Sequence, residues 1–259
     1  MVHRYVIFMF VLIFCGSLAV GREPEDLATQ ALNESEGSRF AEVEAAILHR
    51  TNELRAAQGL QPLSTASYLS EASTIHSEDM LRHDFLSHTS PVPGRTKPKD
   101  RVQLCKGWDT TVGENIYRAS GVPSEQLAER VMEAWEKSPS HYENLTNPKF
   151  NTVGVGVAAK GKDSAVTQVF SFQAIRIRTL RTEPKGESVE LWLEAEVREG
   201  PTEGGVFVND QLLQPFTATG KGEFEIRFEA PVSSRVSISQ KQSGSKYSQA
   251  LSFPVAALR

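Results

Sequence analysis

Two histidines and one glutamate stand where this sequence could do chemistry. His88 lies in the stretch FLSHTSP and His141 in SPSHYENL, each at a short polar turn where a helical pattern stops. Glu114 lies between them, in the polar triplet Gly113-Glu114-Asn115. Two imidazoles and one carboxylate are the donor set of an open, three-ligand zinc site whose fourth position holds water.

The spacing of these residues does not by itself establish a metal site. Zinc-binding histidines often lie one helical turn apart, as in HExxH, and this sequence has no such pair. Residue types alone favour a plainer interpretation, in which both histidines are hydrogen-bonded residues that cap turns. Arg101 could pair with an acid in the same space, although the favoured interpretation is a surface arginine.

The elements that must position these residues are three helices followed by two strands. Residues 91–113 hold prolines and glycines without periodicity, and we expect a long loop there. The order of the elements predicts an α+β domain in which helices cover a small antiparallel sheet. Apolar spacing and period-two alternation place the helices at residues 40–58, 67–83 and 124–137, the last stopped by Ser138-Pro139, and the strands at 152–159 and 167–174.

The rest of the chain is strand-like. SVELWLEAEV, residues 188–197, and GEFEIRFEA, residues 222–230, both alternate apolar with charged residues. Short strands between turns predict a small all-β sandwich at residues 186–259, after a first domain at 40–178. Trp192 points away from the apolar face. It either belongs to a contact patch or packs under a loop. A contact patch would bind a cell-surface partner, a protein partner or the first domain.

The first 21 residues have the layout of a secretory signal peptide, and the polar, acidic residues 22–39 are typical of a linker. We therefore expect a secreted protein, extracellular or periplasmic. Cys15 lies in the leader, so Cys105 is left without a disulfide partner, which fits bacterial export. A net charge of −4 without a basic block argues against a nucleic-acid partner.

Four motifs in order, FLSHTSP, VGENIY, AWEKSPSHYENL and FNTVGVGVA, closely resemble the CAP superfamily, the cysteine-rich secretory, antigen 5 and pathogenesis-related-1 proteins. The resemblance is strongest to the bacterial SCP-like extracellular branch and covers about residues 40–175. It implies an α-β-α sandwich with a polar cavity that can hold a divalent metal. Matched by position, His88, Glu114 and His141 would line that cavity and bind Zn²⁺ or another divalent cation.

The sequence departs from the family at the second acidic position. Animal and plant members have a glutamate there, whereas this chain has Ser138, and the nearby Glu133 and Glu136 face other directions on a helix. A hydrolytic zinc site needs a base as well as ligands. The sequence therefore favours an extracellular module that binds a metal or small ligand over an enzyme. The alternatives are a zinc-dependent hydrolase of peptide or cell-envelope material and a structural or adhesive protein without metal.

Several neighbouring residues have expected supporting roles. We expect Asn115, Asn144 and Ser90 to hold the cavity residues from behind, or the two asparagines simply to cap turns. We also expect His76 to be packed and His83 to face solvent. The glycines of GVGVAA, residues 154–159, lie in a strand and not before a helix, so they favour close approach of a helix or ligand over dinucleotide binding.

Overall fold

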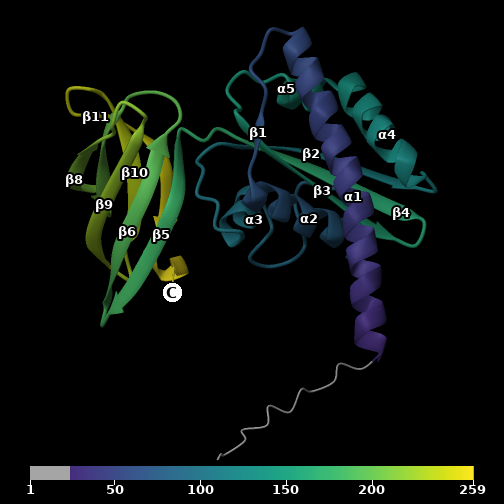
Figure 1. The fold of residues 1–259 in the computed structure, drawn as a ribbon, viewed down its shortest axis with the longest axis horizontal. Coiled ribbons are helices and arrows are strands. Elements are labelled where there is room, and N and C mark those ends of the chain that lie inside the picture. The colour runs from purple at the N-terminus through teal and green to yellow at the C-terminus, as the bar shows by residue number, and fades with distance from the viewer. Residues whose placement is uncertain (1–23, 259) are drawn as a thin grey trace, which may run out of the picture. The chain divides into compact units, whose positions relative to one another are not determined.

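The computed structural model describes residues 24–258, and its side chains from residue 40 onward. The expected signal peptide at residues 1–21 therefore lies outside the described residues. In the described part, no helix is both long and apolar enough to cross a membrane. The first domain contains, in chain order, α1 (Pro24–Ala57), β1 (Ser64–Thr65), α2 (Ser67–Arg82), α3 (Pro98–Leu104), β2 (Val112–Ser120), α4 (Ser124–Lys137), α5 (Pro139–Leu145), β3 (Thr152–Lys160) and β4 (Asp163–Ser171) (Figure 1).

The four strands of the first domain form one sheet in the order β1-β3-β4-β2. β3 and β4 are joined by a tight turn at Gly161, whose φ of +63° is accessible to glycine at little cost. β1 pairs with β3 in parallel, whereas the other pairs are antiparallel. β2 is therefore an edge strand, which leaves one of its sides unpaired.

Successive residues of β3 face opposite sides of the sheet, and each side is covered by helices. Val153, Val155 and Val157 of β3 pack with residues of α1 and α4, including Ile47 and Trp135. The intervening glycines of β3 face α2 instead. The alternation has the period of two that a strand with both faces covered requires. The α-β-α sandwich expected for this part of the chain is confirmed.

The glycines of β3 are where α2 lies against the sheet. A Cβ added to Gly154 would lie 2.1 Å from the backbone nitrogen of Ser70, and one added to Gly156 would lie 2.1 Å from that of Thr74. Ser77 of the same helix donates a 2.8 Å hydrogen bond to the Gly156 carbonyl. The expectation that these glycines permit close approach of a helix is therefore confirmed.

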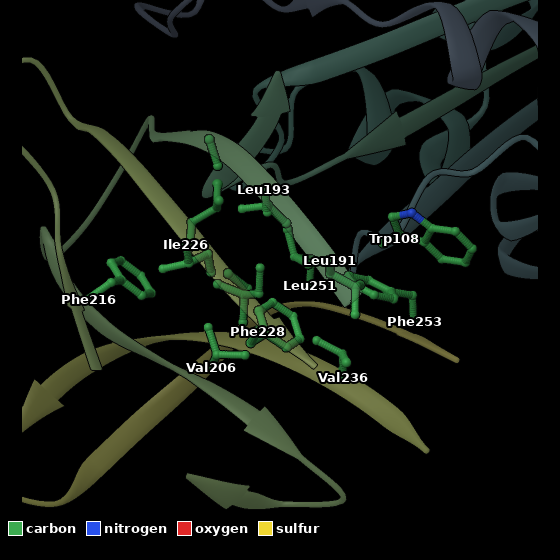
Figure 2. Packing of buried hydrophobic residues seen from close by; sticks show 14 of the residues in the cluster. Trp108, Leu191, Leu193, Val206, Phe216, Ile226, Phe228, Val236, Leu251 and Phe253 are labelled. Atoms are coloured by element: carbon green, nitrogen blue, oxygen red, sulfur yellow. The ribbon is translucent and has the colours of Figure 1, made fainter. Parts of the chain in front are cut away.

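The second part of the chain is all-β. Its strands form two sheets, β11-β10-β7-β8 and β5-β6-β9, which share one apolar core (Figure 2). Trp108, from the loop after α3, belongs to the same core and packs against Phe253 with ring centroids 5.5 Å apart and ring planes tilted by 49°. The elements are β5 (Ile175–Lys185), β6 (Ser188–Val197), β7 (Glu203–Val208), β8 (Gln211–Thr217), β9 (Glu223–Pro231), β10 (Arg235–Ser243), β11 (Lys246–Pro254) and the 3₁₀ helix η1 (Val255–Leu258).

Two short helices contradict the sequence prediction, and both begin with proline. α3 starts at Pro98 inside the expected loop 91–113, and α5 starts at Pro139, which we expected to end helical structure. Proline lacks an N–H and has a fixed φ, so it is suited to the first position of a helix as well as to ending one. His141 consequently lies on a helix and not in a turn.

Two expected boundaries also differ in the structure. α1 begins at Pro24, so most of residues 22–39 is helical where we expected an irregular linker. Glu, Ala and Leu, which are good helix formers, each occur more than once in that segment. β5 begins at Ile175 and pairs with β6 along its length, so the all-β part begins before residue 186, where we expected the sandwich to start. Only the first residues of β5 are buried in alternation, and its residues from Arg181 onward are exposed.

Trp192 is half-buried on the outer face of the sheet β5-β6-β9. The guanidinium of Arg227, which lies opposite it on β9, is 4.6 Å from the ring centroid. This cation–π contact covers part of the indole. The tryptophan therefore packs beneath an arginine and not under a loop.

Candidate functional site

Glu114 is the centre of the candidate site. It lies on the edge strand β2 with 2% of its side chain exposed. Its Oε2 accepts a 2.7 Å hydrogen bond from Nη2 of Arg101, and its Oε1 accepts one of 2.8 Å from Nδ1 of His88. Both carboxylate oxygens are therefore engaged by side chains of this chain.

Arg101 is a buried partner of this carboxylate, which corrects the expectation of a surface arginine. Its side chain is fully buried, and it also donates to the carbonyls of Arg95, Thr96 and His88. The KDRV stretch gave no sign of this burial because α3, which positions Arg101, was itself missed. A buried ion pair with several further hydrogen bonds holds the carboxylate in one orientation.

His88 lies between the buried carboxylate and solvent. Its side chain is 53% exposed. Because Glu114 is an acceptor, the Nδ1 of His88 donates the hydrogen bond, and the neutral ring then has its lone pair on Nε2. The ring is thus held with one nitrogen on the protein and the other nitrogen free to bind.

His141 lies on α5, the short helix that follows α4. Asn115 of β2 donates a 3.2 Å hydrogen bond to the His141 carbonyl. Asn144 donates to the Glu114 carbonyl at 3.1 Å and to Oδ1 of Asn115 at 2.9 Å, so the two asparagines fasten α5 to the edge strand. Asn115 and Asn144 therefore link α5 to the strand that carries Glu114.

His141 is partly buried and interacts electrostatically with His88. Burial lowers the pKa of His141, and the nearby His88 lowers it further. The Nδ1 of His141 is buried and has no hydrogen-bond partner within the described residues. His88 therefore contacts Glu114 directly, whereas His141 forms no hydrogen bond with either His88 or Glu114 among the described residues.

His76, on α2, lies next to Glu114. Its ring is fully buried, as expected, and its Nε2 donates a 2.9 Å hydrogen bond to the Ser87 carbonyl. The same nitrogen is 3.8 Å from Oε1 of Glu114. Burial lowers the pKa of His76, although the attraction of Glu114 opposes this shift. His83, in contrast, is exposed, as expected.

Because His76 is harder to protonate when folded, the free energy of unfolding should fall as the pH drops below about 6.5, the ordinary histidine pKa. The unfolded chain then binds a proton that the folded chain does not. The slope is at most about 1.4 kcal/mol per pH unit for this residue. Urea unfolding between pH 7.5 and 5.5 measures it, and His76→Gln should flatten the profile. Equal slopes for both proteins would contradict the prediction.

Three other residues do not enter the site. Ser90, expected to support it, donates instead to Asp79 at 3.0 Å, in a neighbouring network that includes Arg95. Ser90 follows His88 by two residues, but the chain turns it toward α2. Glu133 forms an ion pair with Lys137, and Glu136 forms one with Arg50, so both face elsewhere, as expected.

Ser138 occupies the position of the family's second acid. It lies between α4 and α5, and its Oγ is 3.5 Å from Oγ of Ser140. Within residues 40–258, no group of three His, Cys, Asp or Glu side chains has an arrangement that could hold a metal ion.

The helix–sheet–helix sandwich of this part of the chain is the architecture that the resemblance in the four sequence motifs implied, and a comparison with protein families agrees. Residues 48–172 match the model of the cysteine-rich secretory protein family, CAP. This part of the chain is therefore a CAP domain and belongs to that family. The match ends just before β5, where the all-β part begins.

Bacterial proteins are among the relatives. The uncharacterised protein YkwD of Bacillus subtilis (strain 168) is 34% identical over 133 residues, 51% of this chain and 48% of YkwD. The uncharacterised membrane protein YlbC of the same strain is 33% identical over 118 residues, 45% of this chain and 32% of YlbC.

A solved structure also resembles the chain, that of an extracellular protein containing an SCP domain from Bacillus anthracis str. Ames. It is 30% identical, with a TM-score of 0.44, and the match covers 51% of this chain and 40% of that one. The chain thus spans about half the length of YkwD and less of the other two proteins.

Proposed function

We infer that this chain is an exported binding protein whose CAP domain holds a small ligand or a divalent cation between His88 and His141. The observation that carries this function is the hydrogen-bonded series from Arg101 through Glu114 to His88. A buried ion pair costs desolvation energy and is weak evidence of stabilisation. Here the ion pair of Arg101 and Glu114 orients the half-exposed imidazole of His88, and such an oriented imidazole is suited to binding a ligand.

Glu114 fits a supporting role better than the ligand role that the sequence suggested. A carboxylate that accepts the Nδ1 proton of a histidine fixes the tautomer and increases the basicity of Nε2. That is how metal-binding imidazoles are commonly supported. The residues present therefore fit a cation held by two imidazoles and completed by water or by groups of a ligand, and they do not fit a three-ligand site that includes Glu114.

The same contacts argue against the hydrolase alternative. A general base must be free to take a proton from water. Glu114 is held by Arg101, and the position of the second acid is occupied by Ser138. Non-enzymatic binding is thus the function that these residues support. Export rests on the apolar leader at residues 1–21.

Calorimetric titration of Zn²⁺ into the purified chain tests this function. Imidazole suits zinc as a ligand, and we expect one ion per chain. His88→Ala and His141→Ala should each abolish binding, and Glu114→Gln should weaken it about 10- to 100-fold. His83→Ala, which changes an exposed histidine, is the matched control.

Each outcome separates the alternatives. Absence of zinc uptake, or unchanged uptake in both alanine variants, would remove the metal from the proposal. A chelator-sensitive hydrolysis of peptides or cell-envelope fragments that disappears in His141→Ala would establish the hydrolase instead. If Glu114→Gln lowered only the stability, by about 1–3 kcal/mol, and the chain bound no zinc, the structural alternative would hold.

A further inference from the structure

A second polar centre lies away from the histidines, in a cavity of about 300 Å³. Its walls come from α2, from the loop after α3, from β5 and from the C-terminal residues, including Tyr68, Asp109, Ile177, Leu180, Leu251 and Leu258. The volume is at the lower end of ordinary small-molecule sites. None of the residues assigned to the histidine site lines this cavity.

The polar end of the cavity is a buried carboxylate. Asp109 is 4% exposed and accepts a short hydrogen bond from the hydroxyl of Tyr68. Gln173 donates in turn to the Tyr68 hydroxyl at 2.8 Å. Within residues 40–258, Asp109 forms no ion pair, and burial raises its pKa. The hydrogen bond from Tyr68 and the charge of Arg198 oppose this rise of the pKa. This carboxylate is therefore desolvated and lacks a cation in direct contact with it.

The remaining walls are largely apolar. Ile177 and Leu180 of β5 and Leu251 of β11 supply aliphatic surface, and Leu258 lies at the C-terminal side. Lys106 lines the cavity as well, but its side chain belongs to an exposed residue and makes no ion pair with Asp109. An apolar body with one positive group at its end would match both the walls and the carboxylate.

We propose that this cavity binds a small organic amine, with its apolar body against Ile177, Leu180 and Leu251 and its ammonium group on Asp109. The ammonium group would form the direct ion pair that Asp109 lacks, since Arg198 acts on the carboxylate only from a greater distance. The aliphatic walls would exclude water from the pair. Close charge pairs that are shielded from solvent can be strongly favourable. This site is independent of the histidine pair, so either proposal can fail alone.

Three probes of the same shape test the charge preference. Benzylamine, benzyl alcohol and benzoate are titrated into the purified chain and followed by protein NMR or calorimetry. Benzylamine should bind in the millimolar range, as suits a ligand of its size. Benzyl alcohol should bind at least about tenfold more weakly, and benzoate should not bind.

Two variants locate the site. Asp109→Asn keeps an acceptor for Tyr68 but loses the charge, and should reduce benzylamine to the affinity of benzyl alcohol. Leu180→Trp should fill the cavity and abolish binding of every probe. His88→Ala is the control and should leave benzylamine binding unchanged.

The proposal is overturned if benzylamine fails to bind at about 20 mM, or binds no better than benzyl alcohol. It is also overturned if benzylamine binds Leu180→Trp as it binds the unaltered chain. Should Asp109→Asn fail to fold by circular dichroism, the three probes and the Leu180 variant decide the question without it.

Discussion

Replacing Gly156 with alanine should lower the free energy of unfolding by about 3 kcal/mol or more, near the upper end of over-packing effects. The added Cβ would lie 2.1 Å from the backbone nitrogen of Thr74. Backbone atoms of a helix cannot swing aside as the end of a side chain can, so α2 as a whole must move from the sheet. That movement would also break the hydrogen bond from Ser77 to the Gly156 carbonyl.

Urea unfolding measures this loss, and the chain offers a matched control. A Cβ on Gly220 would meet no atom within 4 Å, and its φ is not in the left-handed region. Gly220→Ala should therefore leave the stability within about 0.5 kcal/mol of the unaltered chain. If Gly156→Ala behaved like this control, the close approach of α2 to β3 would be wrong.

Arg101→Met should cost about 3–5 kcal/mol, because it leaves the Glu114 carboxylate buried without its main counter-charge. It also removes the donor to three backbone carbonyls. The double variant Arg101→Met with Glu114→Leu removes both charges, and should recover a large part of the lost stability. Unfolding of the four proteins in urea completes a double-mutant cycle.

An exposed ion pair is the control for this cycle. Arg82 and Glu78 lie one turn apart on α2, with 58% and 49% of their side chains exposed. Arg82→Met should cost no more than about 1 kcal/mol. Equal losses for Arg82→Met and Arg101→Met would show that the Arg101–Glu114 pair is not desolvated, and the orienting role of Glu114 would then lose its basis.

Local patterns determined most of the fold in advance. Period-two alternation marks β3, β6 and β9, since alternate residues face the core. Helical spacing marks α2 and α4, and Trp135 is in the core on α4. Glycines at alternate positions of β3 predicted the close approach of a helix or ligand. Four short motifs were enough to identify the CAP domain.

The sequence did not predict β2, α3 and α5, whose secondary structure depends on the segments that pack around them. β2 is an edge strand that carries Glu114 and Asn115, so its polar residues do not alternate as those of a half-buried strand would. α3 and α5 are single short segments that begin with proline, and proline can start a helix or end one.

The four motifs, through their resemblance to the CAP family, predicted that two histidines and a glutamate would lie in one region of the domain. The tertiary structure alone decided what each of them does there. Whether Arg101 meets water or the Glu114 carboxylate depends on where a distant edge strand passes, and no local pattern records that. The same holds for Asp109, which is buried by residues from both parts of the chain. Secondary structure follows from interactions between near neighbours, whereas the partners of buried charges follow from how remote segments pack.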